Sequence, residues 1–84
     1  MKVYVLTMRD DTGDYTPRVY WDLKSAQNGM KDFYNEKLEE EKDNIDDYTE
    51  TVLSSEWFNI ELKDNFICGS IYECDIEVNE NGNK

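Results

Sequence analysis

The sequence predicts an α+β domain of ββαββ order, in which one antiparallel sheet has one amphipathic helix packed on a face. The helix is predicted over residues 22–42, where apolar side chains recur at spacings of three and four and so form one stripe. On both sides of this segment, short runs rich in valine, isoleucine and aromatic residues are typical of strands. An apolar stripe on one helix needs a sheet to cover it, which gives the two-layer arrangement.

Length and composition predict a single folded unit. A chain of 84 residues has room for one modest hydrophobic core, which we expect within residues 1–78. The net charge of −11 favours disorder, but 38% hydrophobic and 13% aromatic residues are enough to build a core. Residues 79–84 contain no apolar anchor and are expected to form a disordered polar tail.

A first hairpin is predicted before the helix. Residues 2–8 are apolar on both sides of the expected strand, which favours an interior position in the sheet. Residues 10–14 form the turn, because glycine and aspartate accept the backbone angles that a hairpin needs. Residues 15–21 form the second strand, and Pro17 indicates a sheet edge because proline lacks an N–H. The aspartates of the turn lack the ligand spacing of a calcium loop, so we interpret them as turn residues.

The predicted helix has a clear start and an uncertain end. Asp22 is the expected N-cap, with Ser25 as a competing cap. Gly29 falls mid-helix and is interpreted as tolerated there instead of as a point of close approach. The helix end stays open between Lys37 and Lys42, because the acidic residues there are compatible with either. The core-facing stripe is predicted to consist of Leu23, Ala26, Met30, Phe33, Tyr34 and Leu38.

Strand character returns after the helix. Residues 43–47 are polar and are predicted to be a linker. Residues 49–62 are predicted to be extended, with a bulge at residues 54–56, and residues 63–65 form a turn. Residues 65–78 are predicted to be the last strand or a pair of strands.

Acidic residues are concentrated at the end of the predicted helix and in the linker. Residues 36–50 hold eight acids and two lysines, and negative charge at a helix C-terminus opposes the helix dipole. One interpretation is a solvated segment whose charge keeps the chain soluble, and the other is a binding surface for a basic partner. The candidate partner-binding residues of this acidic cluster are Glu36, Glu39, Glu40, Glu41, Asp43, Asp46 and Asp47.

The last predicted strand supplies a second group of candidate partner-binding acids. Glu73, Asp75 and Glu77 alternate with Tyr72 and Cys74, so we expect the acids on the solvent face and the others on the core face. Such an acidic row could take the place of phosphates against a basic protein, and it could equally serve solubility and block edge pairing.

Residues that support catalysis are missing from the sequence. The chain has no histidine and no glycine-rich phosphate loop, so we expect it not to be an enzyme. Its acidity disfavours nucleic acid and anionic lipid as direct ligands, because phosphate binding depends on Lys and Arg. No apolar run reaches the ~20 residues of a membrane span, and the N-terminal run is too short for a signal peptide. A cytoplasmic location is therefore expected.

Cys68 and Cys74 leave two interpretations open. On one straight strand, they lie too far apart for a disulfide or a shared metal and are two small buried residues. If the chain turns at residues 69–70, the thiolates could approach and bind zinc together with carboxylates or with cysteines of a second copy.

Three features together resemble the small acidic proteins that bacteriophages and mobile elements direct against host defence. They are the acidic residues 36–50, the row of Glu73, Asp75 and Glu77, and the opening strand at residues 2–6. That class includes anti-CRISPR proteins and other DNA mimics. The resemblance implies a non-catalytic inhibitor in the host bacterial cytoplasm that binds a nucleic-acid-handling enzyme, such as a CRISPR effector nuclease, and prevents DNA loading.

A second function class competes with this one. The chain could be a small accessory or regulatory module that binds another protein through exposed aromatic residues around Trp57, Tyr15 and Tyr20. High salt would weaken a complex made through acids and leave one made through apolar contacts largely intact.

Overall fold

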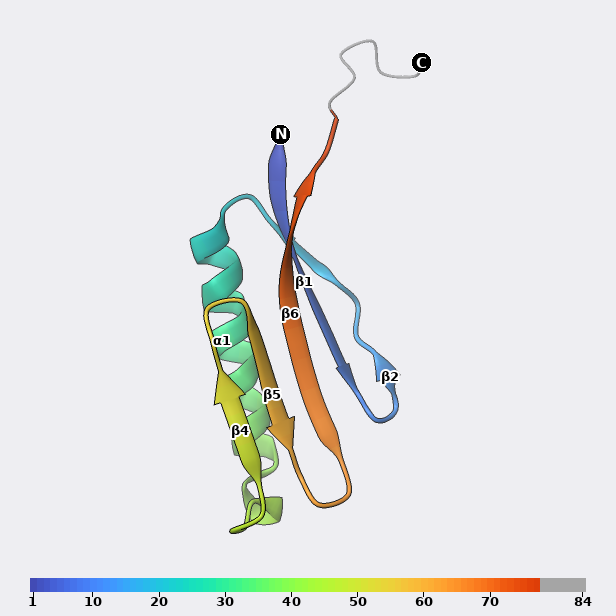
Figure 1. Cartoon of the computed structure of the whole chain (residues 1–84), viewed down its shortest axis with the longest axis vertical. Helices are drawn as coiled ribbons and strands as arrows, with labels where there is room; N and C mark the ends of the chain where they lie inside the picture. Colours follow the sequence, from blue (N-terminus) through green and yellow to red (C-terminus); the bar gives the residue numbers. More distant parts are fainter. Residues whose placement is uncertain (78–84) are drawn as a thin grey trace.

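The computed structural model describes residues 1–77, which form one antiparallel sheet of six strands with helix α1 packed on one face (Figure 1). The predicted α+β class and its ββαββ order are confirmed. The predicted polar tail, residues 79–84, lies outside the described residues. The elements are β1 Lys2–Asp10, β2 Gly13–Asp14, β3 Arg18–Tyr20, α1 Leu23–Glu40, the 3-10 turn η1 Lys42–Asn44, β4 Glu50–Leu53, β5 Trp57–Glu61 and β6 Phe66–Asp75.

The first and last strands lie side by side in the middle of the sheet. The strand order is β2-β1-β6-β5-β4, and β3 pairs with the same edge of β1 as β2. All nine residues of β1 pair with β6, from Lys2 opposite Asp75 to Asp10 opposite Ile67. The predicted interior position of the first strand is therefore confirmed.

The second predicted strand is broken at Pro17. The prediction of one strand over residues 15–21 is wrong, because only Arg18–Tyr20 pairs with β1 in this region. Proline lacks the N–H that a ladder needs, so pairing resumes only after it. Before the break, the backbone N–H of Tyr15 still donates to the carbonyl oxygen of Met8 at 2.9 Å.

Helix α1 begins where Asp22 caps it. The Asp22 carboxylate accepts a hydrogen bond from the backbone N–H of Ser25 at 2.7 Å, so Ser25 lies inside the first turn and is not the cap. The pKa of Asp22 is lowered, chiefly by this backbone hydrogen bond. The α-helix ends at Glu40, within the range left open by the sequence, and the predicted linker contains η1.

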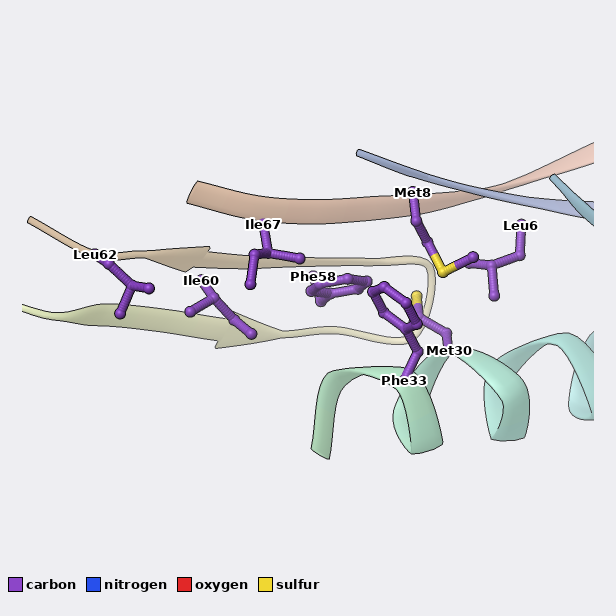
Figure 2. Close-up of a cluster of buried hydrophobic side chains, with 8 residues drawn as sticks. All are labelled: Leu6, Met8, Met30, Phe33, Phe58, Ile60, Leu62 and Ile67. Carbon is purple, nitrogen blue, oxygen red and sulfur yellow. The ribbon is translucent and has the colours of Figure 1, made fainter. Parts of the chain in front are cut away.

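The core lies between α1 and the sheet, where Met30 and Phe33 point toward side chains of three strands (Figure 2). Phe58 is fully buried at its centre, with the rings of Phe33 and Tyr34 at 5.8 and 5.7 Å between centroids. Opposite Phe58 the paired residue is Gly69, and a Cβ atom there would lie 2.5 Å from the Phe58 ring. Gly69 therefore makes room for the largest core side chain, and it does not break β6.

Two local predictions are wrong, one because of a distant residue and one because of a local turn. The ring of Tyr20 in β3 packs directly on Gly29 of α1, so the interpretation of Gly29 as merely tolerated is wrong. The segment at residues 54–56 is a hairpin turn between β4 and β5, and not a bulge. Ser54 closes this turn, because its hydroxyl accepts from the backbone N–H of Trp57 at 3.1 Å and donates to its carbonyl oxygen at 3.0 Å.

Strand pairing divides the sheet residues between two faces. Residues opposite each other point to the same side, so the buried Leu6, Met8, Phe58, Ile60 and Ile67 mark the face covered by α1. In Figure 1, α1 passes behind β4 and β5, and the face toward the viewer is the one that α1 leaves uncovered. We call this the open face, and its central residues are Val5, Thr7, Val19, Val52, Trp57, Asn59, Cys68, Ser70, Tyr72 and Cys74, together with Val3, which is buried despite lying on this side.

Candidate functional site

The acidic cluster occupies one end of the molecule, where α1 ends and η1 begins (Figure 1). Every candidate residue of the cluster is exposed except Glu41, which is half-buried. Residue 41 is the C-cap of α1, and its backbone N–H donates to the carbonyl oxygen of Lys37 at 3.0 Å. The structure therefore places these acids on one continuous segment.

Hydrogen bonds give this segment a defined conformation. The Asn44 side-chain amide donates to the Glu41 carboxylate at 2.6 Å, and the Asn44 backbone N–H donates to the Glu41 carbonyl oxygen at 2.8 Å. The carboxylate of Asp46 accepts from the backbone N–H of Tyr48 at 2.8 Å, and Thr49 accepts from the N–H of Asp46 at 3.0 Å. These bonds form two local sets, one within residues 41–44 and one within residues 46–49, and each fixes one carboxylate of the cluster, that of Glu41 and that of Asp46.

Lys37 belongs to the core more than to the acidic surface. Its side chain is only 16% exposed, and its ammonium lies 5.2 and 5.3 Å from the ring centres of Tyr15 and Phe33. Burial opposes its charge, but hydrogen bonding to Tyr15 and to Glu40 outweighs burial, so the pKa of Lys37 is raised. Lys37 pairs with Glu40 at 3.3 Å, which offsets one acid of the cluster.

The outer acids are left with little compensation. Lys42 pairs with Glu39 at 3.1 Å. Within residues 1–77, no lysine or arginine lies within ion-pair distance of Asp43, Asp46 or Asp47. The unpaired carboxylates are thus concentrated around η1, beyond the last turn of α1.

A hollow of about 410 Å³ separates η1 from the β5–β6 turn. We call it the acidic hollow. Glu41, Asp43 and Asp46 line one side, and Asp64 and Asn65 line the other, together with Asn44, Ile45, Leu62 and Lys63. The side-chain oxygen of Asn65 is buried and has no hydrogen-bond partner in the described part of the chain. The four carboxylates of Glu41, Asp43, Asp46 and Asp64 outnumber the one lysine of the lining, Lys63, so the hollow is rich in acceptors and suits an ammonium or guanidinium group.

The second group of acids lies at the other end of the sheet, close to the start of β1 (Figure 1). Glu73 is 3.6 Å from the Lys2 ammonium and accepts from the Tyr4 hydroxyl at 3.4 Å. Asp75 lies 3.0 Å from the Met1 amine, and Glu77 is exposed beyond the end of β6. The structure therefore does not bring the two acidic groups together, and nearby cations offset much of the second.

The predicted faces of the last strand are reversed. Ile67 and Gly69 face α1, so Glu73 and Asp75 share the core side of β6, at an end of the strand where they are exposed. Tyr72, expected in the core, lies on the open face and is 55% exposed. Acidic and apolar residues alternate most clearly at residues 72–77, at the exposed end of β6. Exposure there does not distinguish the two faces, so this alternation predicts the wrong side.

Cys68 and Cys74 lie on one continuous strand and face the same side. Six residues of extended chain separate them by roughly 20 Å, so the turn that a shared zinc site requires is not formed. Both thiols are free and half-buried, where full burial was expected. Within residues 1–77, no three Cys, Asp or Glu side chains are grouped in a way that could hold a metal ion.

The aromatic candidates separate into two groups. Tyr15 and Tyr20 pack against the core on the helix side, whereas Trp57 is 45% exposed on the open face. Sequence reasoning missed Tyr72 and Val19, which are also exposed there at 55% and 64%. Only the pairing register shows that Val19, Trp57 and Tyr72 share one surface, because they come from three different strands.

In the first hairpin, the carboxylate of Asp10 accepts hydrogen bonds from neighbouring residues, which agrees with its interpretation as a turn residue. The Asp10 carboxylate accepts from the Thr12 hydroxyl at 2.6 Å, the Thr12 N–H at 2.8 Å and the Tyr15 hydroxyl at 2.9 Å. These bonds, led by that of the Thr12 side chain, lower the pKa of Asp10. Burial, followed by the bond to Asp10, raises the pKa of Tyr15.

Comparison with known proteins finds no family model, no curated protein and no solved structure that matches this chain. In the part of the chain that the structure describes, α1 is not apolar enough to cross a membrane.

Proposed function

We propose that the chain is a non-catalytic inhibitor whose acidic cluster binds the basic surface of a nucleic-acid-handling enzyme and so blocks DNA loading. The observation that supports this proposal best is the acidic hollow. It brings the carboxylates of Glu41, Asp43, Asp46 and Asp64 to the lining of one hollow of about 410 Å³, against the single lysine Lys63. A lysine or arginine side chain of the partner fits this chemistry, because it supplies only donors and carries the opposite charge.

The arrangement of the acids supports binding by fixed charges. A flexible acidic loop would have to be ordered on binding, at a cost in conformational entropy. Here the Glu41 carboxylate accepts from the Asn44 side-chain amide and the Asp46 carboxylate from the backbone N–H of Tyr48, so these two acids are already partly ordered in the free protein. Carboxylates in fixed positions can replace phosphates against lysine and arginine residues. An RNA-guided nuclease is the partner class that the resemblance to anti-CRISPR proteins implies, and it is the class to test first.

The test is charge reversal with a matched control. The variant E39K/E40K/D43K changes three exposed acids of the cluster, and the control D11K/D32K/E56K changes three exposed acids elsewhere. Both raise the net charge by six, because each substitution replaces −1 by +1. Tagged proteins are used to capture partners from a bacterial lysate at about 0.1 M and about 0.5 M salt, over which the screening length falls roughly twofold.

We expect the wild type and the control to capture a basic DNA- or RNA-handling protein at the lower salt only, and the cluster variant to capture none. The captured enzyme should then lose its nucleic acid binding when the wild type is added. Equal capture by both triple variants would contradict the proposal, as would capture that persists unchanged at the higher salt. Circular dichroism of each variant verifies that the fold is kept.

A further inference from the structure

The open face of the sheet is apolar and poor in charge, which is unusual in a chain with a net charge of −11. Val19, Val52, Trp57 and Tyr72 are between 42% and 64% exposed there. Exposed apolar side chains gathered from four strands are typical of a protein interface.

Charge is confined to one end of the open face. Among its strand residues, Arg9 is matched by Asp14 at 3.9 Å, and Glu50 and Glu61 pair opposite each other on β4 and β5. The rows that contain Val5, Tyr72 and Trp57 have no acidic residue. A basic partner would find few counter-charges here, so the occupant that fits is another neutral, apolar surface.

A hollow lies close to Trp57 on this face. It measures about 350 Å³ and is lined by Thr7, Met8, Cys68, Gly69, Ser70 and Tyr72, with the ion pair of Arg9 and Asp14 at one side. Small side chains form its floor, while Tyr72 and Arg9 are large. Trp57 stands opposite Ser70 on the neighbouring strand, 45% exposed. The open face therefore carries an exposed side chain and a hollow next to each other. We call them the Trp57 projection and the sheet hollow.

We propose that two copies of the chain associate face to face through the open face, with Trp57 of each copy seated in the sheet hollow of the other. The two-fold axis runs parallel to the strands in the plane between the two sheets, above the line between β5 and β6. It places β5 of each copy over β6 of the other, so each copy both gives and receives one indole ring. Such an isologous contact needs a surface complementary to itself, and the adjacent projection and hollow provide one. The same rotation brings Arg9 of one copy toward the end of β4 and β5 that carries Glu50 and Glu61 in the other copy, so opposite charges face each other there.

The size of the open face agrees with a dimer. Strand rise and spacing give it an area of roughly 500 Å² in each copy. Two such faces approach the ~1,000 Å² of total buried surface above which a specific interface is expected. The acidic cluster extends beyond the end of α1, on the side of the sheet away from this contact, so the two clusters need not approach each other (Figure 1).

Sedimentation equilibrium of the purified full chain tests this proposal at loading concentrations from about 1 µM to about 100 µM. The wild type is expected to reach the mass of a dimer within this range, and W57S and S70R to associate at least tenfold more weakly. The control Y48S removes a tyrosine that is 86% exposed in the acidic segment, and it should behave like the wild type. A wild type that stays monomeric throughout, or a W57S variant that dimerises normally, would overturn the proposal.

A cross-linking experiment distinguishes lost contact from lost folding. Cys68 lines the sheet hollow, so in the proposed dimer the Cys68 thiols of the two copies lie across the contact from each other. Facing sheets are about 10 Å apart, so in a C74S background that keeps Trp57 a bifunctional maleimide of about that reach is expected to give a covalent dimer, and C68S should abolish it. Treated protein that remains monomeric would count against the face-to-face contact. Neither experiment involves an acidic residue or a partner enzyme, so failure here leaves the proposed inhibitor function to be judged separately.

Discussion

The hydroxyl group of Tyr20 occupies the space in which a Cβ atom of residue 29 would lie. Tyr20 is on β3, paired with Tyr4, and Gly29 is on the side of α1 that faces the sheet. The glycine therefore allows the helix to approach the sheet edge at this point, and the aromatic ring fills the gap that the missing side chain leaves.

Substitution G29A should not bring the gain in stability that alanine brings to an ordinary helix, because the added methyl group displaces the Tyr20 ring. In an ordinary helix the same substitution would raise stability by about 1 kcal/mol. The measurement is urea denaturation of G29A in the wild-type and Y20A backgrounds. In the Y20A background, G29A should become stabilising, and equal effects in both backgrounds would show that Tyr20 does not constrain position 29.

The cap at Asp22 predicts a specific pH dependence. A lowered pKa in the folded state means that the charged carboxylate stabilises the fold above the unfolded-state value of 3.8, and that this contribution is lost as the pH falls through the lowered folded-state pKa. We therefore expect D22N to melt at a lower temperature than the wild type at neutral pH. The two melting curves should converge below pH 3.8. A difference that persists unchanged at lower pH would mean that the charge of Asp22 does not contribute.

Glu36 is expected to lower the stability of the fold while it contributes to binding of the basic partner. This exposed residue has acidic neighbours at Asp32, Glu39 and Glu40, three or four positions away on α1, and it lies in the half of the helix where negative charge is disfavoured. Substitution E36K should raise the free energy of unfolding by about 0.5–1 kcal/mol. It should also weaken capture of the basic partner at low salt. A variant that gains stability and binds as well as the wild type would place Glu36 outside the interface.

Much of the fold follows from patterns within single segments. The stripe with Ala26, Met30 and Phe33 was enough to predict α1 and its buried side, and the apolar run from Val3 to Met8 was enough to predict an interior strand. These patterns are visible because burial repeats at the period of the element itself.

Other features depend on contacts between segments, and the sequence does not show them. The role of Gly29 requires the position of Tyr20, which lies on a different element. The acidic residues of the cluster could be found from composition. The acidic hollow could not, because it forms where η1 meets Asp64 and Asn65 of a distant turn.

The pairing of β1 with β6 has a consequence for how the molecule reaches its folded state. The central pair of strands joins residues as far apart as Lys2 and Asp75, so the sheet cannot close before nearly all of the described chain has been synthesised. Until then α1 can already form, but Met30 and Phe33 lack some of the side chains that they pack against in the folded protein. Contacts of such large sequence separation slow folding and leave apolar surface exposed meanwhile. The dense negative charge of the nascent chain would keep neighbouring copies apart during that interval.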